Sequence, residues 1–409
     1  MRKIGIVVMA NALEGEKGPD RFRYIAKYLS KYGFQVDLIT SKFQHWTKKI
    51  RKEEEIKNQD YRVILCDQPT YYKNIDFQRI YSLYIFANNV KKYLESKIKD
   101  YDLIYCSIPD NFTASKVVDI CNKNKVPIII DVEDLWPEAM RMVIDIPIIS
   151  DILFYPFVKS AEKAYLLCSG VIGTSDEYRD RPFKKLNRSI PKETIYVGNE
   201  LKRFDKGIEK YSNDIEKSNN EFWITYAGTI GKSYDLETLL LVAKELFKKG
   251  YKNIKFKILG LGPDLERLKK LISRDSAQVE FLGYVEYEKM AAYLSKSDIV
   301  INSFVKKAPQ SIVTKIGDYL ASGKPMINTC SSIEFKNKVE RDNFGINIEA
   351  ENVEELEKAI LKLYENEELA QNLGKNARKI AEKEFDREKS YYKIVEMVNS
   401  LLGENNEKI

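Results

Sequence analysis

Short apolar runs alternate with longer amphipathic stretches along most of the chain. The runs are rich in Val and Ile, and the stretches between them repeat their apolar residues at the spacing of a helix. Parallel strands that are covered on both faces and connected by helices have this pattern. For the first half we predict strands at 3–9, 35–40, 63–66, 103–107, 127–132 and 170–174, and helices at 20–32, 80–97, 113–124 and 148–167. This half is therefore expected to form a doubly wound α/β sheet.

The alternation is interrupted once and then starts again. Residues 200–221 are polar and charged, which favours a linker. Beyond them we predict strands at 222–227, 255–259, 279–281, 299–303 and 325–329, with helices at 236–249, 264–274, 286–295 and 316–322. Residues 354–402 are predicted to be helical. The sequence thus predicts two Rossmann-like βαβ domains, 1–199 and 222–385, that face a shared cleft and are followed by a C-terminal helix, 386–409.

Composition narrows the chemistry. The chain has 409 residues, 44% of them hydrophobic, which is enough for two or three domains with large cores. Its five cysteines lie too far apart for a CxxC pair, and His45 is the only histidine, which we expect at the surface, so neither a zinc site nor a histidine-based triad is expected. We expect reduced, buried thiols and therefore a cytoplasmic location. No apolar stretch is long enough to span a membrane, so we expect no spanning helix.

The positive charge is concentrated at the start of the chain. Residues 1–110 contain 20 basic and 14 acidic side chains, an excess equal to the net charge of +6 of the whole chain. Aromatic residues such as Tyr72, Tyr81, Tyr84 and Phe86 are interleaved with these lysines. Such a surface suits an anionic membrane, for example the inner face of the cell membrane, and we expect no nucleic-acid partner. A solvated lysine-rich surface explains the same residues equally well.

Two glycine-containing segments each follow a predicted strand and precede a predicted helix. They are Gly228–Lys232 (GTIGK) and Gly260–Pro263 (GLGP). Glycine allows the backbone to approach a phosphate, and the helix that follows offers free N–H groups. Neither segment matches a dinucleotide fingerprint, a P-loop or a nucleophile elbow. Each glycine alone is explained at least as well as a turn residue.

The segment 309–325 (PQSIVTKIGDYLASGKP) is the most informative. Gln310 and Asp318 are separated by seven residues, and Lys315 lies three before Asp318. This arrangement resembles the donor site of retaining glycosyltransferases with the GT-B fold, in particular glycosyltransferase family 4. In that family two glutamates at this spacing contact the transferred sugar and the ribose of the nucleotide. Further segments are similar to donor-domain landmarks in the same order, at 226–240, 256–268, 281–285 and 297–301.

Segments outside the donor domain are similar to the branch of this family that builds bacterial surface polysaccharides, such as capsules. They are 73–86, 131–138 (DVEDLWPE) and 196–199 (YVGN). The resemblance implies an N-terminal acceptor domain, a C-terminal donor domain, and a final helix that packs back on the N-terminal domain. It implies retaining transfer of a hexosyl or N-acetylhexosaminyl group from a UDP-linked sugar to a hydroxyl of a saccharide or lipid-linked saccharide. No metal ion or other cofactor is expected.

The resemblance also assigns residues to the site. Donor-binding residues are expected at Gly228, Thr229, Gly231, Lys232, Gly260, Val285, Gln310, Ser311, Lys315 and Asp318. Acceptor-binding residues are expected at Arg21, Asp131 and Asp134, and catalytic residues at Lys315, Gln310 and Asp134. Lys315, with Lys232, would stabilise the departing diphosphate. The amide of Gln310 can still bond a sugar hydroxyl, and Asp318 keeps the carboxylate that a ribose diol needs.

Alternatives remain for residues and for function. Asp131, Glu133 and Asp134 equally well cap the segment that follows them, and Asp318 and Lys315 have the alternative of being ordinary surface residues of a helix. A nucleotide-sugar epimerase uses the same two-domain fold, although such chemistry needs clustered acid and base groups. A non-catalytic sugar-binding or partner-stabilising protein is the third candidate, because Gln310 and Thr229 depart from the family pattern.

Overall fold

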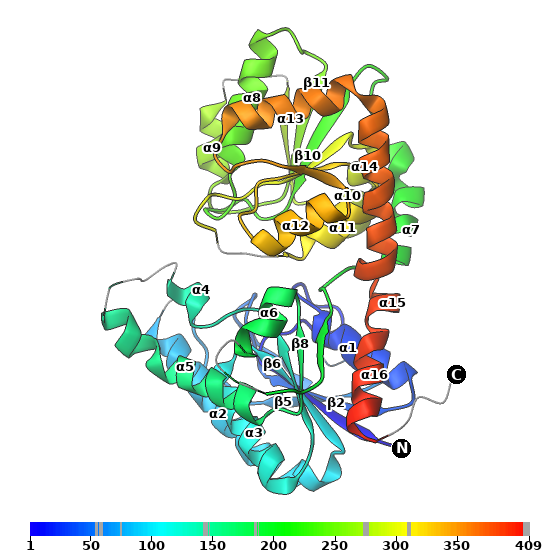
Figure 1. Cartoon of the computed structure of the whole chain (residues 1–409). Helices are drawn as coiled ribbons and strands as arrows, with labels where there is room; N and C mark the ends of the chain where they lie inside the picture. Colours follow the sequence, from blue (N-terminus) through cyan, green and yellow to red (C-terminus); the bar gives the residue numbers. More distant parts are fainter. Residues whose placement is uncertain are drawn as a thin grey trace. The chain divides into compact units, whose positions relative to one another are not determined.

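The computed structural model describes residues 1–53, 56, 60–73, 76–141, 146, 148–183, 186, 188–272, 278–308 and 312–403. The chain folds into two compact units. The first consists of Met1–Ile195 and Tyr391–Ile409, and the second of Tyr196–Ser390. Each unit contains one parallel sheet with helices on both faces (Figure 1). The predicted pair of doubly wound Rossmann-like domains is therefore confirmed.

The first unit has a seven-stranded parallel sheet in the order β5-β2-β1-β6-β7-β8-β9. Its strands are β1 (Lys3–Val8), β2 (Gln35–Ser41), β5 (Arg62–Cys66), β6 (Leu103–Ile108), β7 (Ile128–Val132), β8 (Gly170–Gly173) and β9 (Lys192–Thr194). Every residue of β6 and β7 is buried, as expected for central strands covered on both faces. A separate antiparallel pair, β3 (Phe43–Gln44) and β4 (Lys49–Ile50), follows β2.

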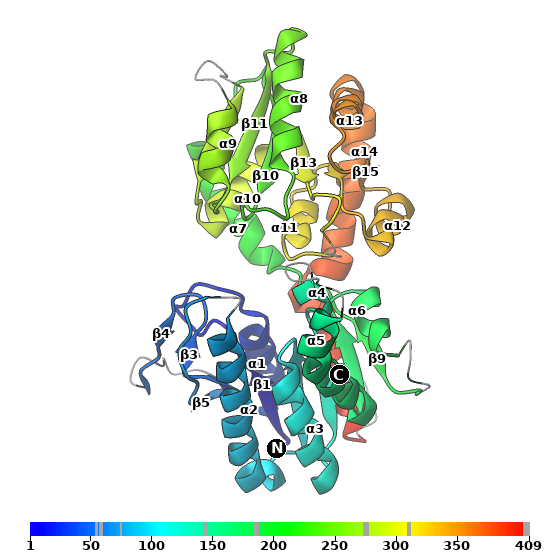
Figure 2. The ribbon, with the colours of Figure 1, turned by 90° about the vertical axis from the view of Figure 1, so that its left-hand side faces the viewer.

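Helices α2 (Phe77–Lys97), α3 (Asn111–Asn124) and α5 (Ile149–Leu167) lie side by side on one face of this sheet (Figures 1 and 2). Helices α1 (Arg21–Lys31) and α16 (Tyr392–Leu401) pack on the other face through buried side chains such as Ile25 and Ile394. The C-terminal helix thus belongs to the first unit, although the chain has passed through the second. Shorter segments are α4 (Glu138–Arg141), η2 (Ile98–Asp100), α6 (Asp176–Asp180) and η3 (Arg181–Phe183).

The second unit has a six-stranded parallel sheet in the order β12-β11-β10-β13-β14-β15. Its strands are β10 (Phe222–Ala227), β11 (Ile254–Leu259), β12 (Val279–Gly283), β13 (Ile299–Asn302), β14 (Met326–Asn328) and β15 (Gly345–Asn347). The strand order reverses direction between β10 and β13, which pair directly through Ile224 and Ile299. Sheets of this kind bind ligands beyond the carboxyl ends of the strands at such a reversal.

Helices cover both faces of the second sheet. Helices α8 (Leu236–Lys248), α9 (Leu265–Leu271) and α13 (Val353–Glu365) pack on one face. On the other are α7 (Leu201–Tyr211), α10 (Tyr287–Lys296), α11 (Lys315–Ala321), α12 (Ile333–Arg341) and α14 (Glu367–Ile380). The chain continues through η5 (Ala381–Phe385) and α15 (Arg387–Ser390).

Two features differ from the sequence prediction. Residues 200–221, expected to be a linker, contain α7, which is packed into the second unit through Leu201, Phe204 and Gly207. These buried positions recur at every third residue among charged side chains, so the apolar pattern is sparse. The prediction also omitted α12, the short pair β3 and β4, and the three-residue strands β9 and β15, neither of which contains a fully buried residue.

Two sequence expectations concern membranes and thiols. Within the described part of the chain, no helix is long and apolar enough to cross a bilayer. All five cysteines are described, and each is a buried thiol.

Candidate functional site

Three aromatic rings surround the ammonium of Lys315 beyond the carboxyl ends of β10 and β13. The Lys315 Nζ lies 3.9 Å from the ring centre of Tyr234, 4.4 Å from that of Tyr226 and 5.3 Å from that of Phe304. It also donates a hydrogen bond of 3.3 Å to the Tyr226 hydroxyl oxygen. The faces of aromatic rings attract a cation. We call this group the lysine cage.

The fold positions each member of the cage. Tyr226 is the penultimate residue of β10, and Phe304 lies two residues beyond the end of β13. Lys315 is the first residue of α11, which is held against β10 by Tyr319. The Tyr319 hydroxyl accepts a hydrogen bond of 2.8 Å from the N–H of Ala227 and donates one of 3.0 Å to its carbonyl. The ammonium is therefore fixed where the strand order reverses.

The cage leaves a positive group without a counter-ion. Shielding from water lowers the pKa of Lys315 to about 7. Among the residues that the structure describes, no carboxylate forms an ion pair with it. An anion bound in the cage would favour the protonated form of Lys315 and would be attracted by its full positive charge. Lys232, by contrast, is exposed and has no ion-pair partner in the described ranges.

The glycines next to the cage allow two loops to touch. Gly228 and Gly260 have φ values of +157° and +134°, which glycine adopts most readily. A Cβ at Gly260 would lie 1.8 Å from the Gly228 carbonyl oxygen, and one at Gly262 would lie 2.0 Å from that of Ile230. A Cβ at Gly228 would lie 3.3 Å from the Lys315 Nζ. The turn interpretation thus holds for Gly260, whereas Gly228 also leaves one side of the ammonium uncovered.

Asp318 lies one turn beyond Lys315 on α11 and is half-buried. Its Oδ1 accepts hydrogen bonds from the Asn199 Nδ2 at 2.9 Å and from the Tyr287 hydroxyl at 2.8 Å. Burial raises the pKa of Asp318, while these two hydrogen bonds oppose the rise. Both donors use the same oxygen, so Oδ2 accepts none from the described residues. The alternative of an ordinary exposed helix residue is therefore wrong for Asp318.

Asn199 is a partner that sequence reasoning did not assign. It belongs to the YVGN segment, in which Gly198 has a φ of +60°. A Cβ at Gly198 would lie 2.2 Å from the Phe385 carbonyl oxygen, and the N–H of Asn199 donates to that same oxygen at 2.9 Å. The segment is thus docked against the end of η5, which aims the Asn199 amide at Asp318. The motif was visible in the sequence, but its target was not.

The other residues predicted for the donor site lie in different surroundings. Thr229 is exposed, and its carbonyl accepts a hydrogen bond of 2.6 Å from the Tyr226 hydroxyl. Gly231 has no atom closer than 3.8 Å to a Cβ added there, and Val285 packs in the apolar core two residues beyond β12. Gln310 and Ser311 lie outside the described residues, so their roles stay predictions. No group of His, Cys, Asp and Glu side chains in the described ranges could hold a metal ion.

In the first unit, the predicted acceptor residues Arg21 and Asp131 pair with each other. The guanidinium donates to both carboxylate oxygens, at 3.0 and 3.3 Å, and to the Tyr391 hydroxyl at 2.9 Å. The Tyr105 hydroxyl donates to Asp131 at 2.6 Å. Arg21 is 2% exposed and Asp131 is fully buried. This burial leaves neither side chain accessible to an acceptor, and it indicates a network that joins α1, β6, β7 and the start of the C-terminal segment.

Asp134 and Glu133 both have partners within the first unit. The Asp134 Oδ1 accepts a hydrogen bond of 2.8 Å from the N–H of Leu135, and burial raises its pKa. Glu133 lies 3.7 Å from Arg21. The cap interpretation and the catalytic role of Asp134 both stay predictions, whereas Asp131 is the ion-pair partner of Arg21 rather than a cap.

Cationic and aromatic side chains gather beyond the carboxyl ends of the first unit's strands. The Arg79 guanidinium lies 4.9 Å from the Trp136 ring centre, and the Lys48 Nζ lies 4.5 Å from that of Tyr71. The His45 Nδ1 is 2.6 Å from the Tyr71 hydroxyl. Burial, Lys48 and Arg79 together lower the pKa of His45 to about 4. We expected His45 at the surface, and this prediction is wrong, because the side chain is half-buried. With its lowered pKa, His45 is neutral at neutral pH.

Comparison with known proteins bears on the second unit first. Residues 207–380 match the family model for glycosyl transferases group 1. This range contains the lysine cage and Asp318. The unit that holds the cage is thus similar to a glycosyltransferase domain.

Two curated relatives match part of the chain. An uncharacterized glycosyltransferase of Methanocaldococcus jannaschii is 30% identical over 215 residues, which is 51% of this chain and 53% of that protein. The alpha-monoglucosyldiacylglycerol synthase of Acholeplasma laidlawii is 28% identical over 193 residues, 47% of this chain and 46% of that protein. The match thus spans about half the length of these relatives.

Solved structures match nearly the whole chain in fold. Sucrose-phosphate synthase of Thermosynechococcus elongatus has a TM-score of 0.73 at 16% identity, covering 98% of this chain and all 100% of that one. The HepE protein of Anabaena, in complex with UDP-glucose, has a TM-score of 0.66 at 16% identity and the same coverage. With two parallel Rossmann-like sheets in one chain, this similarity establishes the GT-B fold.

Proposed function

We propose that the protein is a glycosyltransferase that moves a sugar from a nucleotide diphosphate sugar to a hydroxyl acceptor. The observation that carries this proposal is the lysine cage. A cation with no carboxylate partner among the described residues lies at the strand-order reversal of the unit that matches the glycosyl transferases group 1 model. A diphosphate is the anion that a nucleotide-sugar would bring to this position.

The charge of Lys315 then serves the reaction directly. When the bond between the sugar and the diphosphate breaks, negative charge grows on the departing phosphate oxygen. A fixed cation that faces this oxygen stabilises the transition state more than the ground state. In this proposal the Asp318 Oδ2 accepts hydrogen bonds from the ribose diol, and Gln310 contacts the transferred sugar.

The finer assignments belong to the same proposal. UDP is the favoured nucleotide, since a structure of similar fold, HepE, holds UDP-glucose. Membership of glycosyltransferase family 4, retention of configuration, and a hexosyl or N-acetylhexosaminyl group rest on the resemblance of segment 309–325. The acceptor is a saccharide or lipid-linked saccharide, as in bacterial polysaccharide or glycoconjugate synthesis. The name of the Acholeplasma laidlawii relative, a glucosyldiacylglycerol synthase, favours a lipid-linked one.

We also propose that the protein is cytoplasmic and associates peripherally with an anionic membrane through the first unit. Tyr72, Tyr81 and Tyr84 are exposed there, whereas Phe86 is buried in the core and takes no part. Each nearby Lys or Arg contributes about 1 kcal/mol at an anionic leaflet. Sedimentation with anionic vesicles, reversed by salt, is expected, and equal recovery in the supernatant with anionic and neutral vesicles would refute the association.

Incubation with labelled UDP-sugars tests the proposed activity against its rivals. Transfer to an added saccharide, or slow hydrolysis without one, supports a glycosyltransferase. Formation of the epimeric UDP-sugar would indicate an epimerase, and binding without turnover would indicate a non-catalytic protein. The Lys315→Ala variant links any activity to the cage, because contaminating enzymes would be unaffected by it.

A further inference from the structure

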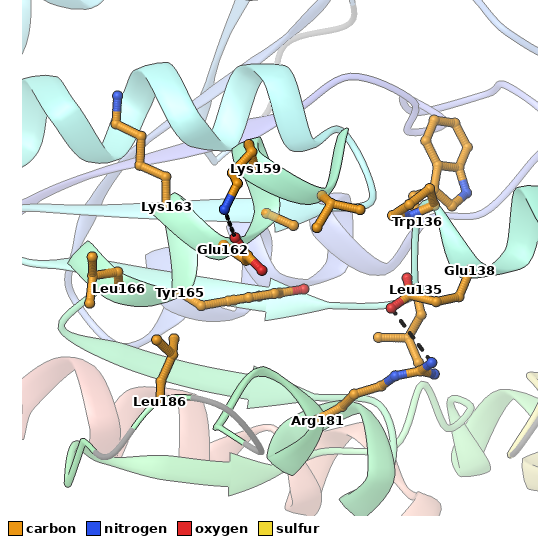
Figure 3. A pocket seen from close by; sticks show the side chains of 13 residues that line it. Leu135, Trp136, Glu138, Lys159, Glu162, Lys163, Tyr165, Leu166, Arg181 and Leu186 are labelled. Carbon is orange, nitrogen blue, oxygen red and sulfur yellow. Dashed lines mark hydrogen bonds and ion pairs between the residues drawn. The ribbon is translucent and has the colours of Figure 1, made fainter. Parts of the chain in front are cut away.

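The first unit contains a pocket of about 780 Å³ along α5 (Figure 3). Its walls include Leu135, Val158, Ala161, Tyr165 and Leu166. Small-molecule sites measure roughly 300 to 1,000 Å³ and are lined mainly by apolar and aromatic side chains. The pocket therefore has the size and the lining of a ligand site. We call it the α5 groove.

The charged side chains around the groove already have partners. The Lys159 Nζ lies 2.9 Å from Glu162, and Arg181 lies 3.5 Å from Glu138, as the dashed lines in Figure 3 show. Lys163 pairs with Asp119 on α3. The walls thus present mainly hydrocarbon to an occupant, while the charges lie in local ion pairs. A ligand whose body is apolar fits such a surface better than a sugar does.

An exposed apolar surface leads into the groove along the same face of α5. Ile152 and Tyr155 are 71% and 58% exposed. They precede Lys159 and Leu166 at helical spacing, so all four side chains share one stripe of α5. The two later residues line the groove. A hydrocarbon chain on Ile152 and Tyr155 would reach the groove past Lys159, whose methylene stem is apolar and whose ammonium pairs with Glu162.

The end of the groove near Phe157 meets the cationic group at the strand ends, because the Trp136 and Phe157 carbonyls accept hydrogen bonds from the same Asn111 amide. Trp136 lines the groove, and the Arg79 guanidinium lies 4.9 Å from the centre of its ring. Lys48 shares the Tyr71 ring with Arg79, at 4.5 and 5.7 Å. Burial and the charge of Arg79 both lower the pKa of Lys48, as expected for two cations beside one ring. An anionic headgroup would be attracted there.

We propose that the α5 groove binds the hydrocarbon chain of a lipid-linked saccharide acceptor whose lipid carries a phosphate, with that phosphate beside Arg79 and Lys48. That the bound lipid is the acceptor rests on the proposed function, whereas the binding of a lipid phosphate does not. The occupant comes from a bilayer, and the exposed stripe of Ile152 and Tyr155 is the side from which it enters. The proposal thus names the substrate class of the first unit.

Alkyl phosphates below their micelle-forming concentrations are suitable probes for the full chain. In calorimetric titrations we expect dodecyl phosphate to bind. Decyl and octyl phosphate should bind more weakly, by about fourfold for each methylene removed. Dodecyl glucoside, which lacks the charge, should bind roughly tenfold more weakly. Affinity that does not depend on chain length would overturn the groove, and equal affinity for the glucoside would overturn the phosphate site.

A matched pair of variants locates the binding site. Leu166→Glu places a carboxylate at the groove, and Leu241→Glu places one on α8 in the second unit. The two leucines are 50% and 48% exposed, so both variants should fold. We expect Leu166→Glu to weaken dodecyl phosphate binding by roughly tenfold or more and Leu241→Glu to leave it unchanged. Equal effects of the two variants would overturn the assignment to the groove.

The outcome can be separated from that of the proposed function. UDP-sugar binding is measured on the same wild-type protein. If the UDP-sugar binds and dodecyl phosphate does not, the groove proposal is overturned and the glycosyltransferase proposal stands. If dodecyl phosphate binds with the expected chain-length dependence and no UDP-sugar binds, the groove is supported and the donor function is refuted.

Discussion

Arg21 in the first unit and Lys315 in the second are both shielded cations at the carboxyl ends of a sheet, and their neighbours differ. The Arg21 guanidinium is held by the carboxylate of Asp131 and the hydroxyl of Tyr391. The Lys315 ammonium is surrounded by three rings and one hydroxyl, with no carboxylate partner in the described part of the chain. One charge is neutralised within the protein, and the other is not.

This difference separates a structural role from a functional one. Once a buried ion pair has formed, the folded protein depends on both charges, because removing one partner leaves the other charge uncompensated. A shielded cation without a counter-ion lowers the stability of the folded protein, and an anionic ligand relieves that cost. Both residues were site candidates from the sequence, and only their surroundings distinguish them. Removing each charge in turn is the most direct test.

The largest effect is expected for Arg21→Met, and it should fall on stability. The variant leaves the Asp131 carboxylate buried without its partner, which typically costs about 3–5 kcal/mol of unfolding free energy. Urea denaturation measures this loss. Arg23→Met, two residues on in the same helix, removes partly exposed ion pairs to Glu14 and Asp20 and a hydrogen bond to the Leu13 carbonyl, and should cost about 1–2 kcal/mol. A loss for Arg21→Met no larger than for Arg23→Met would contradict the structural assignment.

Lys315→Ala should act on turnover rather than on stability. Removing one group that stabilises developing charge costs about 10² to 10³ in rate, or about 2.7–4 kcal/mol. The control is Lys257→Ala, because the Lys257 Nζ also lies over an aromatic ring, 4.3 Å from the Trp223 centre, but pairs with Glu280. Turnover of that variant should match the wild type. If Lys315→Ala kept full turnover with only a raised KM, Lys315 would be a ground-state contact.

Asp318→Ala should weaken donor affinity by a smaller amount. A hydrogen bond to a charged acceptor contributes about 1.5 to 3 kcal/mol, so the loss should be roughly 10- to 150-fold. Asp318→Glu should restore most of it, because Glu is the residue that the family pattern expects. Tyr287→Phe removes one donor to Oδ1 and keeps the carboxylate, which controls for the loss of local hydrogen bonds. Unchanged affinity of a folded Ala variant in calorimetry would refute the ribose contact.

The sequence predicted the strands, and the segments that carry candidate site residues, better than it predicted contacts between side chains. Hydrophobic alternation located β10 and β13, and the resemblance located Lys315 and Asp318. The cage itself needs the strand order, because Phe304 approaches Tyr226 only when β13 lies next to β10. Nothing local in the sequence shows that pairing. Arg21 and Asp131 were predicted to bind the acceptor, but they form a buried ion pair. Nothing in the sequence indicates that two charged residues so far apart in the chain will be paired and buried.

For a change of one pH unit, the smallest expected effect is the pH dependence of donor binding, which follows from the pKa of Lys315, lowered to about 7. In the unfolded chain a lysine titrates near 10.4, so between these values the unfolded state binds more protons and the unfolding free energy rises with pH. Donor binding has the opposite sign, because the diphosphate requires the ammonium. Above about pH 7 the free protein must take up a proton to bind, and affinity should fall by up to about tenfold, or 1.4 kcal/mol, per pH unit. Calorimetric titration with a UDP-sugar from about pH 6 to about pH 9 measures this slope. Lys315→Met should bind more weakly without it, and a wild-type affinity that stays constant across the range would show that the ammonium does not face the diphosphate.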